Sequence, residues 1–160
     1  PELTVRSARG RDPVRIIIDE NLDLSIDHKV FRKGAQTVII TSSDTETSKE
    51  TIYEQKGITV FRTANNSGFL DIGPVLKELY RSGIRSIMVE GGGTVFEYML
   101  KNKLVNRVNI FIAPKLIGSG KRIFANSKFK TVSDCISLNV TERSFINEDI
   151  FIDALLEYRS

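Results

Sequence analysis

The sequence IRSIMVEGGGTVF, residues 84–96, decides the fold class of this 160-residue chain. Residues 84–90 are apolar and β-branched enough to predict a buried strand, and three glycines follow at 91–93. A helical pattern of apolar residues then runs from Val95 to Leu104. A strand, a glycine turn and a helix start in direct succession indicate an α/β protein.

The segment just upstream supports this interpretation. Residues 71–82 have the clearest helical periodicity of the chain, with apolar side chains at Ile72, Val75, Leu76, Leu79 and Tyr80. Asp71 is expected to cap the start of this helix, and Gly83 is expected to end it in a left-handed conformation.

The remaining elements follow from shorter patterns. A helix is expected over residues 48–56, capped by Thr47 or Ser48. Runs of β-branched and apolar residues predict strands at 13–19, 36–41, 58–61, 105–113, 136–145 and 150–158. The last two are separated by the turn sequence Asn-Glu-Asp and should form an antiparallel pair. The whole pattern predicts one domain, residues 1–160, with a mostly parallel central sheet, helices on both faces and a C-terminal antiparallel pair.

Composition excludes several classes of function. The chain has 23 Lys and Arg against 20 Asp and Glu, and the basic residues are scattered, which argues against nucleic-acid binding. The single cysteine, Cys135, precedes an apolar run and is expected to be a small buried side chain, whereas His28 is expected in an exposed loop. Neither has the partners that a metal site needs. No apolar run approaches a membrane span and no signal peptide is visible, so we expect a cytoplasmic protein without membrane contact.

The glycine turn at residues 91–93 is the first candidate site. Glycines let the main chain approach a ligand closely, and the N–H groups at the start of the next helix favour a phosphate. The turn lacks the G-x-G-x-x-G fingerprint, and a tight turn without a ligand explains the triplet equally well. Glu90 favours a site, because ligands bind at the carboxyl ends of strands in open α/β sheets. A structural hydrogen bond from Glu90 to the turn is the alternative.

The second candidate site is the basic segment at the start of the chain. Arg6 is followed closely by Arg9, Arg11 and Arg15. An arginine beside a sheet edge is suited to bidentate phosphate recognition. On composition alone, a solvated basic loop is the favoured alternative.

Five segments, taken in order, carry a resemblance to a known family. The segments are PELTVR (1–6), GRDPVRIIID (10–19), VEGG (89–92), IAPKLIG (112–118) and NEDI (147–150). Together they resemble the C-terminal reductase domain of the bifunctional riboflavin-biosynthesis deaminase/reductase, which has a dihydrofolate-reductase-like fold. The resemblance implies that a small phosphorylated aminopyrimidine, 5-amino-6-(5-phosphoribosylamino)uracil, is reduced to its ribitylamino product with hydride from NADPH.

The resemblance also implies roles for particular residues. Leu3 and Arg6 match substrate-contacting positions, with Arg6 on the 5′-phosphate. Glu90 matches a glutamate that holds ribose hydroxyls or steers a proton, and is the expected catalytic residue. The expected contacts of the cofactor are Gly92, Gly93, Thr94, Val95, Phe96, Glu97 and Tyr98. By position, residues 41–43 (Thr-Ser-Ser) are expected to help hold the adenosine 2′-phosphate.

The chain also departs from the family pattern. Gly93 stands where the family often has Pro or Ala, and Glu20 stands where a hydroxyl residue commonly follows the aspartate, which weakens a cofactor contact there. The family's first strand and helix and its deaminase half precede the matched segment, so we expect residues 1–160 by themselves to be marginally folded and nearly inactive. The domain is expected to be joined to a deaminase and to form homo-oligomers. The alternatives are a dihydrofolate reductase or another pteridine-like reductase on the same fold, and an inactive scaffold.

Overall fold

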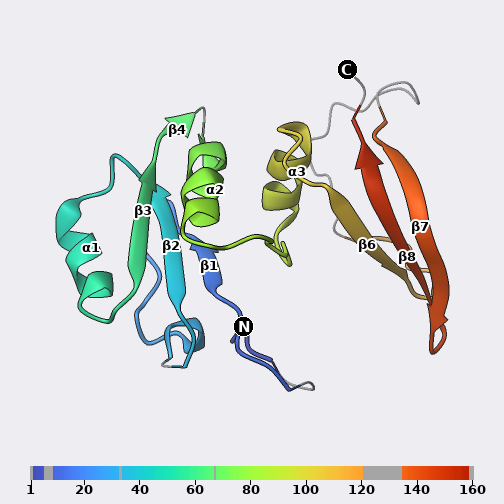
Figure 1. Cartoon of the computed structure of the whole chain (residues 1–160), viewed down its shortest axis with the longest axis horizontal. Coiled ribbons are helices and arrows are strands. Elements are labelled where there is room, and N and C mark those ends of the chain that lie inside the picture. The colour runs from blue at the N-terminus through green and yellow to red at the C-terminus, as the bar shows by residue number, and fades with distance from the viewer. Residues whose placement is uncertain (1, 6–8, 33, 67, 121–134, 159–160) are drawn as a thin grey trace. The chain divides into compact units, whose positions relative to one another are not determined.

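A computed structural model describes residues 2–5, 9–32, 34–66, 68–120 and 135–158. The chain divides into two compact units, Pro1–Ile87 and Met88–Ser160, and each is described by itself (Figure 1). The expectation that residues 1–160 form a single domain stays a prediction.

The first unit is built on a parallel sheet. Strands β1 (Arg15–Ile18), β2 (Thr37–Ser42) and β3 (Thr59–Thr63) lie in the order β1-β2-β3. Every residue of the central strand β2 is buried, as expected for a parallel strand covered on both faces. The parallel strands predicted at these three places are confirmed.

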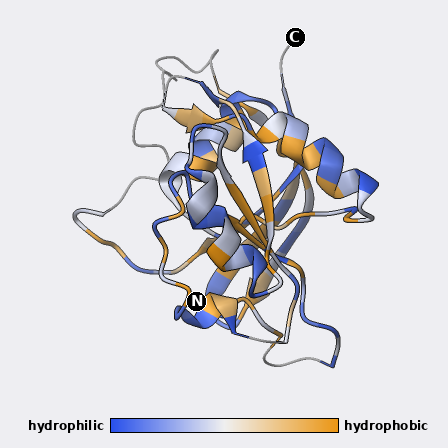
Figure 2. Cartoon of the chain, turned by 90° about the vertical axis from the view of Figure 1, so that its left-hand side faces the viewer, coloured by the Kyte–Doolittle hydropathy of each residue, from blue (hydrophilic) through white to orange (hydrophobic). Residues whose placement is uncertain are grey.

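Helices cover both faces of this sheet, as predicted (Figure 1). Because side chains alternate along a strand, β2 contributes to two separate cores. Val38 and Ile40 pack in one cluster with residues of α2 (Ile72–Arg81), and Ile39 packs in another with Tyr53 of α1 (Thr47–Glu54). Figure 2 shows the helices banded with hydrophilic and hydrophobic residues, the pattern of helices that bury one face.

The ends of α2 are as the sequence predicts, but the start of α1 is not. The Asp71 carboxylate accepts a hydrogen bond from the main-chain N–H of Gly73 at 3.2 Å, and Gly83 has a φ of 94° just after α2. The N-cap position of α1 is Glu46 and has no side-chain cap bond, so the expected cap by Thr47 or Ser48 is wrong. The Ser48 hydroxyl instead donates to the Glu46 carboxylate at 3.3 Å.

Three short elements complete the described part of this unit. The 3-10 helix η1 (Lys29–Phe31) follows β1, and β4 (Asn65–Asn66) pairs antiparallel with β5 (Phe69–Leu70) after β3. They were not predicted, because elements of two or three residues are too short to give a periodic pattern.

The second unit contains helix α3 (Gly93–Lys101) and an antiparallel sheet. Strands β6 (Arg107–Ile112), β8 (Asp149–Glu157) and β7 (Ser137–Ile146) lie in the order β6-β8-β7. The predicted C-terminal antiparallel pair is therefore confirmed, and β6 extends it to a third strand. None of the helices in the described ranges is both long and apolar enough to cross a lipid bilayer.

The strand predicted at residues 84–90 is wrong. This segment has no helix or strand structure, and Met88 is 77% exposed. A β-prone sequence forms a strand only where a neighbouring strand completes its hydrogen bonds, and none of the described strands pairs with this segment. Cys135, expected to be buried, is exposed, whereas His28 is exposed as predicted.

The ion pair between Arg107 and Asp153 joins β6 to β8 and leads to a prediction about acid stability. The Arg107 guanidinium lowers the pKa of the Asp153 carboxyl in the folded protein. The ion pair therefore contributes fully to stability at pH values above the pKa of an unfolded aspartate, about 4. This contribution is lost as the pH falls through the lowered pKa of the folded state. We expect Asp153→Asn to reduce the loss of stability below pH 4, measured as the urea midpoint against pH. Glu157→Gln, on the same strand and exposed, is the control. An unchanged pH slope in Asp153→Asn would contradict the prediction.

Candidate active site

The glycine turn begins helix α3, as the sequence predicts. Gly92 is the N-cap residue, with a φ of 77° that favours glycine, and it has no side chain to cap the first N–H groups of the helix. At Gly91, an added Cβ would have no atom within 4 Å, so the main chain there is open to a ligand. The free N–H groups at an uncapped helix start can bind an anionic group such as a phosphate.

The predicted cofactor residues occupy the first two turns of α3. Thr94 is exposed, and Val95, Phe96 and Tyr98 are half-buried. Glu97 is buried and forms an ion pair with Lys101, with 2.5 Å between Oε1 and Nζ. The Glu97 side chain therefore stabilises the helix.

The predicted substrate residues lie in irregular segments. Glu90 is exposed and comes directly before the glycine turn, but it does not end a strand, because residues 84–90 form none. Leu3 is half-buried with a φ of 50°, and the N–H of Val5 donates to the Asp12 carboxylate at 2.9 Å. Arg6 lies outside the described residues.

The other arginines of the basic segment divide into two kinds. Arg9 and Arg11 are exposed, in agreement with a solvated loop. Arg15 is 3% exposed, and its Nη1 donates to the carbonyl oxygens of Val30 and Arg32, at 2.8 Å each. Arg15 therefore fixes the segment around η1, and neither the favoured solvated loop nor the alternative phosphate-binding loop describes it.

A polar cavity that the sequence analysis did not predict lies at the carboxyl ends of the parallel strands. Its volume is about 440 Å³. It is lined by residues that follow β1 (Glu20, Asn21, Asp23), residues at and after the end of β2 (Ser42, Asp44, Thr45, Glu46, Lys49) and one residue after β3 (Asn65). Open α/β sheets bind ligands at this edge, so the cavity is a further candidate ligand site, formed within the first unit alone.

The loop after β1 is held firmly at the rim of this cavity. The hydroxyls of Thr41 and Thr45 both donate to the carbonyl oxygen of Glu20 at 2.8 Å, and the main-chain N–H of Ser42 donates to the same oxygen at 3.0 Å. The amide of Asn65 donates to the Glu20 carboxylate. Both the main chain and the side chain of Glu20 are therefore fixed in place.

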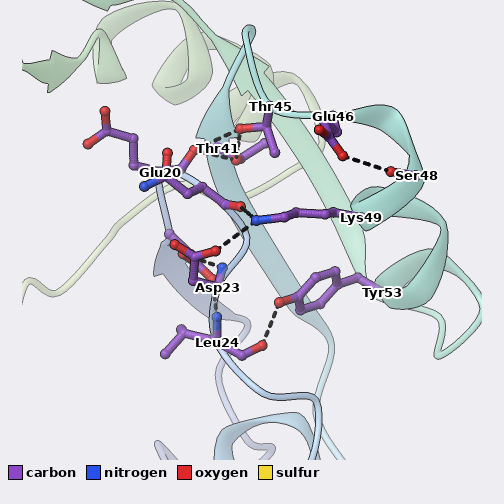
Figure 3. Close-up of polar contacts among 11 residues, drawn as sticks. Glu20, Asp23, Leu24, Thr41, Thr45, Glu46, Ser48, Lys49 and Tyr53 are labelled. Carbon is purple, nitrogen blue, oxygen red and sulfur yellow. Dashed lines mark hydrogen bonds and ion pairs between the residues drawn. The ribbon is translucent and has the colours of Figure 1, made fainter.

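Lys49 from α1 lines the cavity, and Figure 3 shows its side chain reaching toward the loop after β1. Its ammonium group donates to the carbonyl oxygen of Asn21 at 2.9 Å and to the Asp23 carboxylate at 2.7 Å. The hydrogen bond between Lys49 and Asp23 lowers the pKa of Asp23 and raises the pKa of Lys49, so both groups stay charged at neutral pH. The Asp19 carboxylate accepts the N–H groups of Asp23 and Leu24 and so shapes the same loop.

Only part of the expected 2′-phosphate site reaches this cavity. Ser42 lines it, whereas Thr41 is fully buried with its hydroxyl committed to Glu20, and Ser43 is exposed outside the lining. The rule that ligands bind at the carboxyl ends of parallel strands, applied to the strands at 13–19 and 36–41, would have located the cavity from the sequence.

Comparisons with known proteins place the chain in a family. Residues 1–150 match the model of the RibD C-terminal domain. The chain is 30% identical over 154 residues to the riboflavin biosynthesis protein RibD of Aquifex aeolicus, covering 95% of this chain and 41% of the relative. It is 26% identical over 158 residues to the 2,5-diamino-6-ribosylamino-4(3H)-pyrimidinone 5′-phosphate reductase of Methanothermobacter thermautotrophicus, covering 96% of this chain and 72% of the relative.

A solved structure agrees with this result. The diaminohydroxyphosphoribosylaminopyrimidine deaminase/5-amino-6-(5-phosphoribosylamino)uracil reductase of Thermotoga maritima superposes with a TM-score of 0.74 and 28% identity, over 98% of this chain and 41% of that one. The chain spans about two-fifths to one-half of the length of several curated relatives. The likeness confirms the predicted dihydrofolate-reductase-like α/β fold. The chain belongs to the RibD C-terminal domain family.

Proposed function

We propose that this domain reduces the ribose of 5-amino-6-(5-phosphoribosylamino)uracil to a ribityl chain. The observation that carries the proposal is the 28% identity, over 98% of this chain, to a deaminase/reductase whose name gives this uracil compound. A relative named as a pyrimidinone phosphate reductase also matches over 96% of this chain, which covers 72% of that relative. Further relatives with the same name match over 74% of the chain. The proposal extends to a cytoplasmic protein that is joined to a deaminase domain and forms homo-oligomers.

The reaction needs one hydride and one proton. A C–H bond forms at the sugar carbon attached to nitrogen, the bond from that carbon to the ring oxygen breaks, and the ring oxygen takes the proton. A reduced nicotinamide dinucleotide supplies the hydride when bound, and NADPH is the form that the resemblance implies. Hydride transfer requires both molecules to be held in near-attack geometry, which is the task of the protein.

The chain's own residues fit that task. The main chain of Gly92 and Gly93 and the first two turns of α3, as far as Tyr98, would hold the dinucleotide phosphates. Arg6 would hold the 5′-phosphate of the substrate, with Leu3 against its body. Glu90 would hold the ribose hydroxyls or steer the proton, and its exposed position leaves its carboxylate accessible to a ligand.

A closely related substrate is the second candidate. Several relatives are named for 2,5-diamino-6-ribosylamino-4(3H)-pyrimidinone 5′-phosphate, which carries an amino group where the uracil has an oxygen. Assays of the full-length gene product with both pyrimidines, and with dihydrofolate as the rival substrate, distinguish these functions. Turnover of dihydrofolate alone would contradict the proposal.

The glycine turn leads to a prediction about dinucleotide binding. We expect Gly91→Val to weaken dinucleotide binding about tenfold or more, or ~1.4 kcal/mol, because the side chain would occupy space that the ligand needs. An added Cβ there meets nothing within 4 Å and the φ of Gly91 is not in the left-handed region, so the fold should tolerate the change. Isothermal titration calorimetry measures the affinity.

Gly92 is less suited to this test because its φ of 77° makes any side chain strained. We expect Gly92→Ala to lower the free energy of unfolding by about 1–2 kcal/mol, whereas Gly91→Ala should leave it nearly unchanged. Full dinucleotide affinity in a folded Gly91→Val protein would remove the glycine turn from the cofactor site.

Arg6 leads to a prediction about substrate recognition. We expect Arg6→Ala to raise KM for the phosphorylated substrate about tenfold or more, since a charge-assisted hydrogen bond contributes roughly 1.5–3 kcal/mol. The effect on the dephosphorylated analogue should be much smaller, and steady-state kinetics on both compounds measures the difference. Arg9→Ala is a matched control in the same basic segment. Equal losses on the two compounds would mean that Arg6 does not bind the phosphate.

A further inference from the structure

The polar cavity at the carboxyl ends of β1, β2 and β3, called the strand-end cavity below, has the wrong charge to bind the adenosine 2′-phosphate of NADPH. Four of its lining residues are Asp or Glu, and the one cationic residue lining it within the described ranges, Lys49, is already bonded to Asp23 and to the carbonyl oxygen of Asn21. A phosphate monoester carries a charge of about −1.5 to −2 at pH 7. The carboxylates that line the cavity would repel a phosphate bound inside it.

The same lining suits a sugar with free hydroxyl groups. A carboxylate near the end of a strand accepts hydrogen bonds from a ribose 2′-hydroxyl in NAD-binding sheets, whereas an arginine accommodates the 2′-phosphate of NADP. Glu20 is in such a position, and Asn65 bonds to only one of its two carboxylate oxygens. No three His, Cys, Asp or Glu side chains of the described chain converge as metal ligands would.

Ser42 provides an independent indication of a polar ligand. It is 4% exposed and lines the cavity, and its Oγ accepts a hydrogen bond from the N–H of Asp44 at 3.1 Å. Its hydroxyl can also donate a hydrogen bond, and a ribose oxygen in the cavity would be a suitable acceptor.

A second, more apolar cavity adjoins the first. Its volume is about 410 Å³, and the two cavities share Asp23 and Lys49. Its apolar side chains come from the loop after β1 and from α1, and include Leu22, Ile26 and Ile52. A polar cavity beside an apolar one matches a nucleoside, which has a hydroxylated sugar on one side and a flat base on the other.

We infer that these cavities receive the adenosine of the dinucleotide with its ribose unphosphorylated, so that NADH serves this enzyme at least as well as NADPH. Glu20 is the specificity-determining residue: it accepts the 2′-hydroxyl and repels a 2′-phosphate. Asp44, which lines the same cavity and is exposed, adds to the repulsion. The inference rests on the proposed function and refines the identity of its hydride donor.

The test compares NAD⁺ and NADP⁺ binding to the full-length gene product by isothermal titration calorimetry. We expect NAD⁺ to bind at least as tightly as NADP⁺. Glu20→Gln keeps the shape of the side chain and removes its charge, so the ratio of the two dissociation constants should move about tenfold toward NADP⁺. Asp44→Asn, whose carboxylate has no bond within the described residues, should move the ratio in the same direction and covers the case in which Glu20→Gln misfolds. Glu54→Gln, exposed on α1 outside the cavity, is the matched control.

The outcomes separate this inference from the proposed function. A parent protein that prefers NADP⁺ more than tenfold would overturn the inference and leave the reductase function standing. A ratio that neither Glu20→Gln nor Asp44→Asn moves would remove the adenosine from this cavity. Failure to bind either nucleotide would contradict the proposed function itself, and the inference with it.

Discussion

Replacing Leu79 with alanine is expected to lower the free energy of unfolding of the first unit by about 2–5 kcal/mol. Leu79 is 1% exposed and lies in the cluster formed by α2 and one face of β2, which includes Val38, Ile40 and Val75. Removing its side chain leaves a cavity in a core that can relax only partly, because the sheet is also packed on its other face.

Chemical denaturation of the full-length gene product, monitored by circular dichroism, measures this effect. Lys77→Ala is the control, since Lys77 is exposed on the same helix and alanine is at least as good a helix former. Equal small losses in the two variants would mean that α2 does not pack on the sheet as described. Because β2 ends in the strand-end cavity, we also expect Leu79→Ala to weaken nucleotide binding.

Replacing Glu90 with glutamine is expected to lower kcat/KM for the reduction about ten- to a hundredfold, which corresponds to the roughly 1.5–3 kcal/mol of a hydrogen bond to a charged group. Glutamine keeps the shape of the side chain and removes the charge that would hold ribose hydroxyls or steer a proton. Glu90 is exposed and belongs to no helix or strand, so the variant should fold like the parent.

Steady-state kinetics with saturating dinucleotide measures this effect, and dinucleotide affinity should be unchanged. Glu148→Gln removes one negative charge from the exposed turn between β7 and β8 and is the control. A loss of dinucleotide affinity in Glu90→Gln, with kcat/KM otherwise preserved, would place Glu90 in the cofactor site and contradict its role toward the substrate.

The parts of the fold that the sequence predicted well are those with local causes. Helix α2 combines a full apolar face with the Asp71 cap and Gly83, so its bounds could be predicted nearly to the residue. The buried strand β2 is an uninterrupted β-branched run. The turn between β7 and β8 is likewise determined by a few neighbouring residues.

The failures have non-local causes. Residues 84–90 have the composition of a strand, but a strand depends on a partner elsewhere in the chain, which composition does not reveal. Arg15 was grouped with a basic loop, yet it is buried because two carbonyl oxygens about 15 residues later accept its hydrogen bonds. The rule for parallel strands gives the edge of the sheet where the cavity lies. Its lining depends on long-range packing, because Glu20 and Asn65 follow different strands and Lys49 lies on α1.

The sequence predicted the glycine turn of the candidate site, but it did not predict which side chains lie together around the cavity. The glycine turn and the helix start at Gly93 are where the sequence predicts them, while the roles of Leu3, Arg6 and Glu90 stay predictions. Of the expected 2′-phosphate site at residues 41–43, Ser42 lines a cavity that also has four carboxylates in its lining, and the structure shows that they share one cavity.

The proposed reduction is measured most directly by assaying the full-length gene product with 5-amino-6-(5-phosphoribosylamino)uracil and a reduced nicotinamide dinucleotide, NADPH and NADH in parallel. We predict oxidation of the dinucleotide, followed at 340 nm, in a one-to-one ratio with formation of the ribitylamino product identified by mass spectrometry. A folded protein that binds the dinucleotide but reduces neither this compound nor its diaminopyrimidinone counterpart would contradict the proposed reductase function.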